Sequence, residues 1–345
     1  MTDELQILRG WAPPEAGPDE GAAADRARAR LAQHMTAAPR RAHPRWWLLA
    51  APPALIAAAA VAVALVLSLG SGVQEGRIAP APATAAQALE QAARSAERQP
   101  VGEVFPRPGQ FFYTSTRATY LNCLIRAGGG ACALSTQHRQ AWVSATRRGQ
   151  SRTTVLGHRW PSPRERQKWV RLGSPRLATM PAGTFALAPD HGAYLGNERL
   201  SSTQLRRFDQ TGPALYRRLR DGVKHGQGTS RSGEVFTEIG DALREQPAPP
   251  KLRAALYRAL KLVPGVRYLG RVRDPLGRPA LAVARTEGGT RRELLFDPAT
   301  AAMLAEREVV VGPDARRGFD APEGTVIADA VYEQRGVVDR IGQTP

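Results

Sequence analysis

The longest apolar stretch of the chain covers residues 46–69 and contains no charged residue. At 1.5 Å per residue, a helix of this length spans about 36 Å, and the hydrocarbon core of a bilayer is roughly 30 Å thick. Trp46 and Trp47 stand at its start, as is typical of the membrane–water interface. The pattern therefore predicts one transmembrane helix over residues 46–69.

Two other interpretations of this stretch stay open, a buried core helix and a cleavable signal peptide. A core helix rarely runs so long without a charge beside a cluster of arginines. A signal peptide normally has a short polar start and an apolar segment of about 7–15 residues. Here a polar stretch covering residues 1–45 precedes the apolar segment. We therefore favour the transmembrane helix.

Arginines flank this segment unequally, which predicts its orientation. Downstream, as far as residue 90, there is only Arg77, whereas six arginines lie within about 20 residues upstream. These six are Arg26, Arg28, Arg30, Arg40, Arg41 and Arg45. Positive charge is retained on the cytoplasmic side. We therefore expect a cytoplasmic tail over residues 1–45, a linker over 70–83 and an exported domain over 84–345.

The exported part alternates between strand and helix periodicities. Residues 110–119, 140–145 and 152–156 have the strand pattern, while residues 158–198, rich in proline and glycine, predict irregular structure. Helical spacing predicts helices over 84–98, from 201, and over 213–221, 234–245 and 250–263. In the last of these, Leu252, Leu256 and Leu260 form an apolar stripe, and the opposite face, with Lys251, Arg253, Arg258 and Lys261, is expected to meet water.

The C-terminal part predicts a β-meander. Strand patterns over 266–272, 279–286, 291–296, 303–311 and 325–332 are separated by short turns, which join antiparallel neighbours. Helices that pack on one face of such a sheet give an α+β fold. We therefore predict an exported α+β domain, an antiparallel β-meander sheet packed by helices and preceded by one transmembrane helix.

The net charge of +17 narrows the choice of partners. A balance this basic usually indicates nucleic acid or an anionic surface. Almost all of the net positive charge follows residue 69, so an exported domain would carry it. Nucleic acid is therefore not expected as a partner. The predicted partners are anionic lipid headgroups or wall polymers. The densest basic region is either a solvated helix face or a contact with such a surface; it comprises Arg206, Arg207, Arg217, Arg218, Arg220 and Lys224.

Cys123 and Cys132 are the two cysteines of the chain. An even pair in an exported domain favours a disulfide, and the glycines at 128–130 would let the chain turn back between them. Free thiols and a metal site are the alternatives, although two sulfurs without a nearby histidine cannot fill a tetrahedral zinc site. His138 is the histidine nearest the cysteines, and no two histidines have the spacing of metal ligands. We predict no metal and no cofactor.

Sequence motifs for catalysis are weak. The chain has no Gly-x-Ser-x-Gly, Ser-x-x-Lys or His-Glu-x-x-His motif. Asp274 and Asp297 could form a pair of carboxylates, or each could start a β-turn, which is the interpretation we favour. An enzymatic activity is therefore not predicted, and it is not ruled out.

Several segments together resemble a known family. They are the opening MTDELQILR, the single span, and the stretches PPKLRAALYRALKLVPGV, DPLGRPALAV and ELLFDPATAAML. The chain resembles a family of actinobacterial single-pass membrane proteins, and this resemblance implies a tail, a span and an exported α+β domain but no particular activity. The order of tail, span and exported domain is similar to that of membrane-anchored anti-sigma factors. The exported strands are similar to the periplasmic lipoprotein-carrier fold. Both similarities concern the fold alone and imply no shared function. Residues 1–45 contain no cysteine, so the zinc-type anti-sigma motif is absent.

The expected function follows from this organisation. We expect a membrane-anchored envelope sensor or binding protein, whose exported domain is coupled through one helix to the tail. The ligand and the cytoplasmic partner of the tail are not predicted. The alternatives are a cell-envelope enzyme with an unrecognised site and a structural or lipid-handling envelope protein. A cavity between sheet and helices would favour lipid handling, and converging titratable groups would favour an enzyme.

Overall fold

The computed structural model describes residues 84–126, 129–176, 181–189, 193–224, 227–244, 246–313 and 319–345. The predicted tail, transmembrane helix and linker lie outside these residues. Among the described residues, no helix is both long and apolar enough to cross a membrane. The fold below is therefore that of the domain predicted to be exported.

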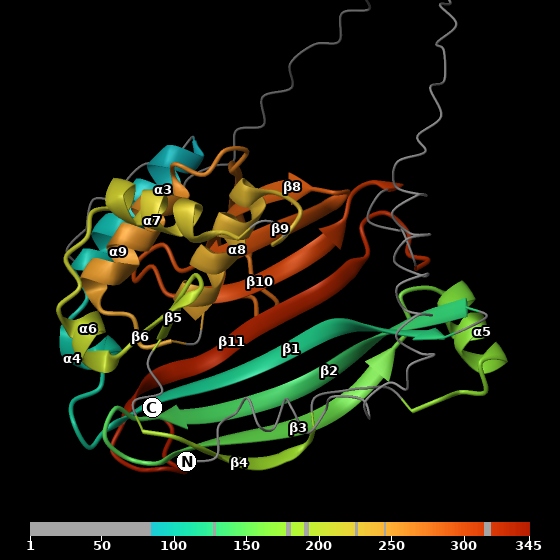
Figure 1. Cartoon of the computed structure of the whole chain (residues 1–345), viewed down its shortest axis with the longest axis horizontal. Coiled ribbons are helices and arrows are strands. Elements are labelled where there is room, and N and C mark those ends of the chain that lie inside the picture. The colour runs from blue at the N-terminus through green and yellow to red at the C-terminus, as the bar shows by residue number, and fades with distance from the viewer. Residues whose placement is uncertain are drawn as a thin grey trace, which may run out of the picture. The chain divides into compact units, whose positions relative to one another are not determined.

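A large antiparallel sheet forms the framework of the described residues (Figure 1). Its nine strands lie in the order β4-β3-β2-β1-β11-β10-β9-β8-β7. Their bounds are β1 Phe111–Arg126, β2 Gly129–Val143, β3 Gly149–Arg159, β4 Gly183–Leu187, β7 Arg267–Arg273, β8 Pro279–Glu287, β9 Thr290–Phe296, β10 Met303–Val310 and β11 Val326–Val338. A separate small ribbon pairs β5 Ala193–Leu195 with β6 Glu198–Leu200.

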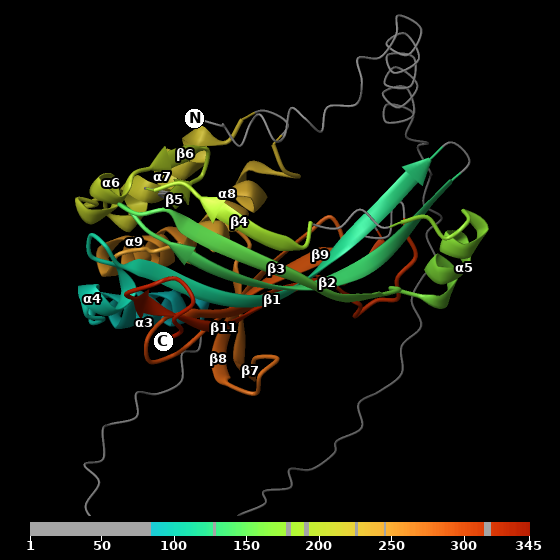
Figure 2. The same ribbon diagram turned by 90° about the horizontal axis from the view of Figure 1, so that it is seen from below.

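The helices are α3 Ala85–Glu97, α4 Val101–Val104, α5 Pro163–Arg171, α6 Ser202–Arg206, α7 Gly212–Gly222, α8 Arg231–Arg244 and α9 Pro250–Leu260. All but α5 gather over one end of the sheet, and α5 lies at the other end beside β1 and β2 (Figure 2). The predicted α+β class, with an antiparallel sheet packed by helices, is confirmed.

The two strand-rich stretches of the sequence form one sheet because β1 pairs with β11. Phe111 lies opposite Val338, and the pairing continues to Tyr120 and Ala328 with one irregularity near Ser115. The first strand of the sheet in chain order and the last one are thus neighbours in its middle. This contact joins the β1–β4 half to the C-terminal meander.

The prediction of irregular structure over residues 158–198 was wrong. Helix α5 and strands β4 and β5 lie in this stretch. Pro163 occupies the first turn of α5, where proline costs no hydrogen bond, and the Ser162 hydroxyl caps the helix by accepting from the Glu165 amide at 3.2 Å. The proline that suggested a loop therefore begins a helix.

Helix α9 occupies the centre of the helical layer. Its leucine stripe is buried, with Leu256 and Leu260 at 0% exposure, and Tyr257 packs on Phe296 of β9 with ring centroids 5.2 Å apart. The predicted packing of this helix on the meander is thus confirmed. Fully burying such side chains stabilises a fold by about 1.5–3 kcal/mol each.

Two of the four residues expected to meet water on the opposite face of α9, Lys251 and Lys261, are exposed, whereas Arg253 and Arg258 are not. Arg253 is buried and donates to the carbonyl of Thr300 at 3.0 Å. Arg258 forms ion pairs with Glu90 and Glu97 of α3. The reason is that α3 lies against Arg258, while the turn between β9 and β10 lies against Arg253.

Candidate binding cavity

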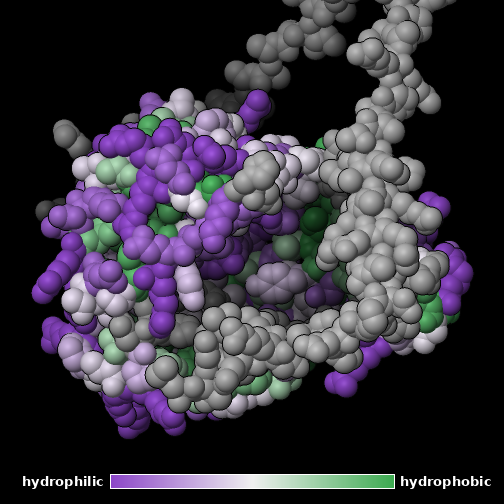
Figure 3. Space-filling model, in the orientation of Figure 1, coloured by the Kyte–Doolittle hydropathy of each residue, from purple (hydrophilic) through white to green (hydrophobic). Residues whose placement is uncertain are grey.

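A cavity of about 460 Å³ lies between α8 and the strands β9, β10, β11 and β1. Figure 3 shows the molecule hollowed beside the helical layer, with hydrophobic residues in the depth of the hollow. A volume of this order falls within the range of small-molecule sites, roughly 300–1,000 Å³. The cavity is therefore the candidate functional site.

The apolar part of the cavity comes from both layers. Phe236 of α8, Leu294 of β9 and Ile327 of β11 line it. Gly240 brings α8 close to the sheet, because a Cβ atom at this position would lie 3.3 Å from Cδ2 of Leu294. A side chain at residue 240 would therefore reach into the space between helix and sheet.

Ion pairs form the polar part. Arg244 of α8 pairs with Asp241 on its own helix and reaches Glu306 of β10 at 3.3 Å. Arg292 of β9 pairs with Glu308 of β10 at 2.5 Å and donates to the hydroxyl of Thr237 on α8. These contacts fasten α8 to the sheet through polar side chains, which holds the helix over the cavity.

The Arg244 guanidinium of this polar part stays charged. Burial acts to lower the pKa of the Arg244 guanidinium, but the carboxylates around it, first that of Glu306, raise its pKa above the ordinary value. A guanidinium stays protonated in any case and cannot serve as a general acid near neutral pH. General acid–base catalysis needs a group whose pKa lies close to the working pH. The Arg244 guanidinium therefore suits binding and orientation of a ligand rather than proton transfer.

His138, the histidine singled out from the sequence, belongs to a different cluster on the sheet. Its Nε2 atom lies 2.8 Å from Oγ of Ser115 and 3.4 Å from Oε2 of Glu333. The Ser115 hydroxyl also donates to Glu333 at 3.2 Å. A catalytic triad uses one ring nitrogen for the serine and the other for the acid. Because both partners here share Nε2, the cluster lacks the triad arrangement.

The two turn aspartates are occupied by their own turns. Oδ1 of Asp274 accepts from the amides of Leu276 and Arg278 at 2.9 and 2.8 Å. Oδ1 of Asp297 accepts from the amides of residues 299 and 300 at 2.9 and 2.7 Å. The favoured interpretation, that each aspartate starts a β-turn, is confirmed.

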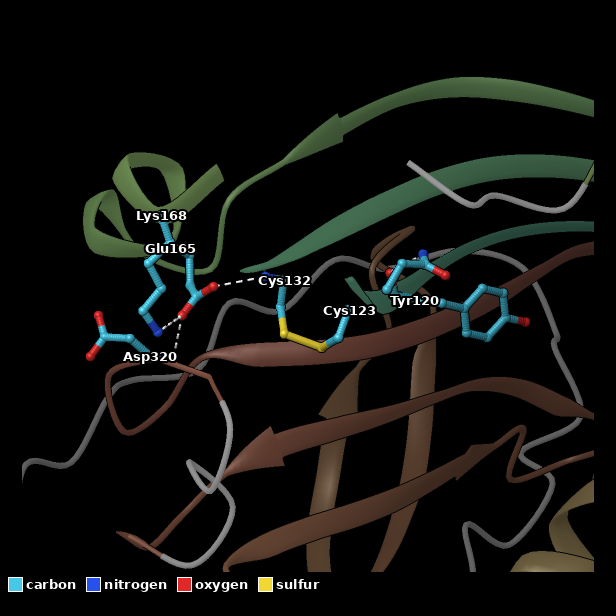
Figure 4. The surroundings of a disulfide bond; sticks show 7 residues. Tyr120, Cys123, Cys132, Glu165, Lys168 and Asp320 are labelled. Atoms are coloured by element: carbon cyan, nitrogen blue, oxygen red, sulfur yellow. Dashed lines mark hydrogen bonds and ion pairs between the residues drawn. A yellow bond between two sulfur atoms is a disulfide. The ribbon is translucent and has the colours of Figure 1, made fainter. Parts of the chain in front are cut away.

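The cysteines are joined, as predicted. Cys123 and Cys132 lie directly opposite each other in the β1–β2 pair and form a disulfide, shown in Figure 4. A bridge that closes a loop of this size stabilises a fold by roughly 2–3 kcal/mol in the chain-entropy model. It fixes the two strands at the end of the hairpin.

Glu165 is a residue that sequence reasoning missed. It is fully buried at the start of α5, and its carboxylate accepts from the Cys132 amide at 2.7 Å, the Asp320 amide at 2.8 Å and the Lys168 ammonium at 2.5 Å (Figure 4). It therefore ties α5, the disulfide-bonded strand and the segment before β11 together. The sequence contains one signal that could have indicated Glu165, because it is the single acidic residue between positions 104 and 189.

The predicted basic region is divided between α6, α7 and the residues after each helix. The Arg206 side chain donates to the carbonyl of Pro106 and lies over the ring of Phe105. Arg218 pairs with Glu198, and Arg220 pairs with Asp221. Half of the region thus has structural partners. The other half, Arg207, Arg217 and Lys224, forms no ion pair with the described residues.

One buried acid on α8 lies outside the cavity. Glu238 is 6% exposed, and neither of its carboxyl oxygens has a hydrogen-bond partner among the described residues. It lies against the turn between β5 and β6, since a Cβ atom at Gly196 would fall 2.9 Å from its Oε2. Burial, with the negative charges of Glu234 and Asp241, raises the pKa of Glu238 from 4.5 to about 7.

We expect this acid to make stability depend on pH. The folded state binds its proton more tightly than the unfolded chain, so its contribution is fully present below pH 4.5 and is lost as pH rises through about 7. The loss is on the order of 2–3 kcal/mol. Denaturant unfolding at about pH 5 and about pH 8 should show it in the wild type, and Glu238→Gln should remove it. An equal fall in both proteins would contradict this assignment.

No protein-family model matches the chain, and no curated protein matches it in sequence. The described residues contain no group of three or more His, Cys, Asp or Glu side chains placed to hold a metal ion. The residues that line the cavity could bind a ligand through apolar contact and through their paired charges.

Proposed function

We propose that the protein is a membrane-anchored envelope sensor or binding protein, and that its exported domain binds a small amphipathic ligand in the cavity beneath α8. One observation carries this proposal. The cavity has Phe236, Leu294 and Ile327 for an apolar body and the paired charges of Arg244 and Arg292 for a polar end. Lipid handling is the second candidate function, favoured by the position of the cavity between sheet and helices.

The anchoring part of the proposal rests on residues outside the described structure. The uncharged run over 46–69 and the excess of arginines before it support a single span with the C-terminus outside. We expect a periplasmic-type reporter fused after Pro345 to be active and a cytoplasmic reporter at the same position to be silent. The reverse pattern would refute this topology.

Filling the cavity should weaken ligand binding without unfolding the protein. Gly240→Leu directs a side chain from α8 toward Leu294, and leucine favours a helix over glycine by about 1 kcal/mol. We expect binding of the fluorescent amphiphile anilinonaphthalene sulfonate to weaken about tenfold, which corresponds to about 1.4 kcal/mol. Titration of the folded protein with the probe measures this.

A matched control is available at Gly222, the last residue of α7. A Cβ atom at Gly222 meets nothing within 4 Å, so Gly222→Leu should bind the probe as the wild type does. Gly222→Leu should keep the thermal midpoint of the wild type within a few degrees, and Gly240→Leu should lower the midpoint by the cost of crowding Leu294, about 1–3 kcal/mol, while staying folded at the titration temperature. If Gly240→Leu and the wild type bind the probe equally well, the cavity is not the binding site.

A further inference from the structure

The charge of the domain is concentrated in one half of the sheet. Residues 104–189, which form β1 to β4 and α5, include thirteen basic residues and one acidic residue, a net charge of +12. The remaining residues of 84–345 carry +4. A solvated surface without a partner normally mixes both signs. This imbalance therefore indicates a surface that meets negative charge.

The acidic residue of this half does not reach the surface. Glu165 is 0% exposed and pairs with Lys168 inside the contact between α5 and β2. The arginines around it are exposed and form no ion pair with the described residues; at the α5 end they are Arg159, Arg164, Arg166 and Arg171. Among residues 104–189, the exposed charges around α5 are thus all positive, and Asp320, whose carboxylate accepts from the Ser162 hydroxyl at 2.6 Å, is a half-buried acid beside them from outside this range.

Exposed aliphatic side chains occur among these arginines. Ile125 is 84% exposed, Val170 is 59% exposed and Leu156 is 54% exposed. They belong to β1, α5 and the end of β3, which meet at the end of the domain away from the other helices (Figure 2). Apolar side chains that stand alone on a surface are ordinary. Their combination with unpaired arginines at one end is the unusual feature.

The end of the β1–β2 hairpin projects beyond its neighbouring strands. Pairing of β1 with β11 stops at Tyr120, and pairing of β2 with β3 stops at Leu134. Residues 122–126 and 129–133 therefore pair with each other alone, and the disulfide and Glu165 hold them in place. We call this projecting hairpin end, together with α5 and residues 155–159, the basic tip.

We propose that the basic tip docks on the surface of an anionic lipid bilayer. Basic residues near such a surface attract it electrostatically, and aliphatic side chains among them enter the boundary between headgroups and acyl chains. An anionic wall polymer would match the charges but would leave Ile125 and Val170 without a partner. Docking of the basic tip does not depend on which ligand the cavity binds. Membrane contact then lies at the end of the domain opposite the predicted basic region on α6 and α7.

Photo-crosslinking of the full chain tests this contact. A photo-reactive amino acid replaces Ile125, and lipid adducts are measured by mass spectrometry in phosphatidylcholine vesicles with or without phosphatidylglycerol. The control position is Leu276, which is 43% exposed in the turn between β7 and β8. We expect adducts at position 125 that depend on phosphatidylglycerol, and few at position 276.

Two charge-reversal triples compare the competing surfaces. Arg164→Glu, Arg166→Glu and Arg171→Glu change the basic tip, and Arg207→Glu, Arg217→Glu and Lys224→Glu make the same change of charge on the other surface. Each basic residue near an anionic bilayer contributes roughly a factor of five. The α5 triple should therefore lower the adduct yield at position 125 roughly a hundredfold, and the second triple should leave it unchanged. Added salt should lower the yield of the crosslinker-bearing protein without charge reversals in the same way, which is a test that needs no charge variant.

Three results would overturn the proposal. The first is an equal adduct yield with and without phosphatidylglycerol. The second is a loss of adducts in the second triple but not in the α5 triple, which would assign membrane contact to α6 and α7. The third result comes from a mixture to which a glycerol-phosphate polymer is added beside the vesicles: crosslinking of position 125 to the polymer but not to lipid would make the tip a polymer-binding surface.

Discussion

Leu256→Ala should destabilise the domain by about 2–5 kcal/mol. Leu256 is 0% exposed in the middle of α9, between the meander and the other helices. Alanine removes buried methyl groups and leaves a cavity that the sheet and α3 cannot close without moving. Denaturant unfolding of residues 84–345 measures the change as a lower midpoint with an unchanged slope.

The control for this substitution is Leu262→Ala. Leu262 follows the same helix and is 40% exposed, so its truncation should cost less than about 0.5 kcal/mol. Arg258, which the sequence pattern places in water, is unsuitable as a control because it pairs with Glu90 and Glu97. Equal midpoints for the two leucine variants would mean that α9 is not packed as the structure has it.

Local patterns in the sequence predicted local structure well. The capping boxes at Thr84 and Ser201 each begin a helix, with the serine or threonine and the glutamine three residues later bonding reciprocally. The turn at Asp274 separates β7 from β8 as expected. In these cases the residues that decide the conformation lie within a few positions of one another.

Contacts between distant residues could not be predicted in this way. The pairing of Phe111 with Val338 joins residues at opposite ends of the domain, and nothing in either segment alone specifies the other. The cavity could not be predicted for the same reason, since it also depends on contacts between distant residues. Arg244 and Glu306, for example, meet only when α8 lies over β10. Strand pairing over such separations depends on the whole hydrophobic pattern of the sheet and not on a local motif.

The basic surface illustrates a different limit. Counting basic residues in a short window led to Arg206–Lys224, where half of the charges have partners within the fold. The scarcity of acidic residues over residues 104–189, which contain Glu165 alone, would have indicated the half of the domain that includes α5. The density of positive charge alone cannot separate a structural pair from a docking surface, because pairing depends on which carboxylates the fold brings near.

Glu165→Ala should also destabilise the domain strongly, by about 3–5 kcal/mol. The buried carboxylate accepts from the amides of Cys132 and Asp320 and from the ammonium of Lys168. Removing it leaves the buried amide of Cys132 and the half-buried amide of Asp320 without an acceptor, and a buried group left in this way costs about 1–3 kcal/mol. The Lys168 ammonium loses the carboxylate that it pairs with, and α5 loses its tie to the hairpin.

The matched control is Glu323→Ala, which removes an exposed acid from the segment between Asp320 and β11 and should cost less than about 0.5 kcal/mol. Hydrogen exchange gives a second, local readout. In Glu165→Ala the amides of Cys132 and Asp320 should lose their protection, while that of Leu256 should follow the global stability alone. Wild-type protection at both amides, with an unchanged unfolding free energy, would show that Glu165 does not hold α5 to the hairpin, and the rigid basic tip proposed above would lose its support.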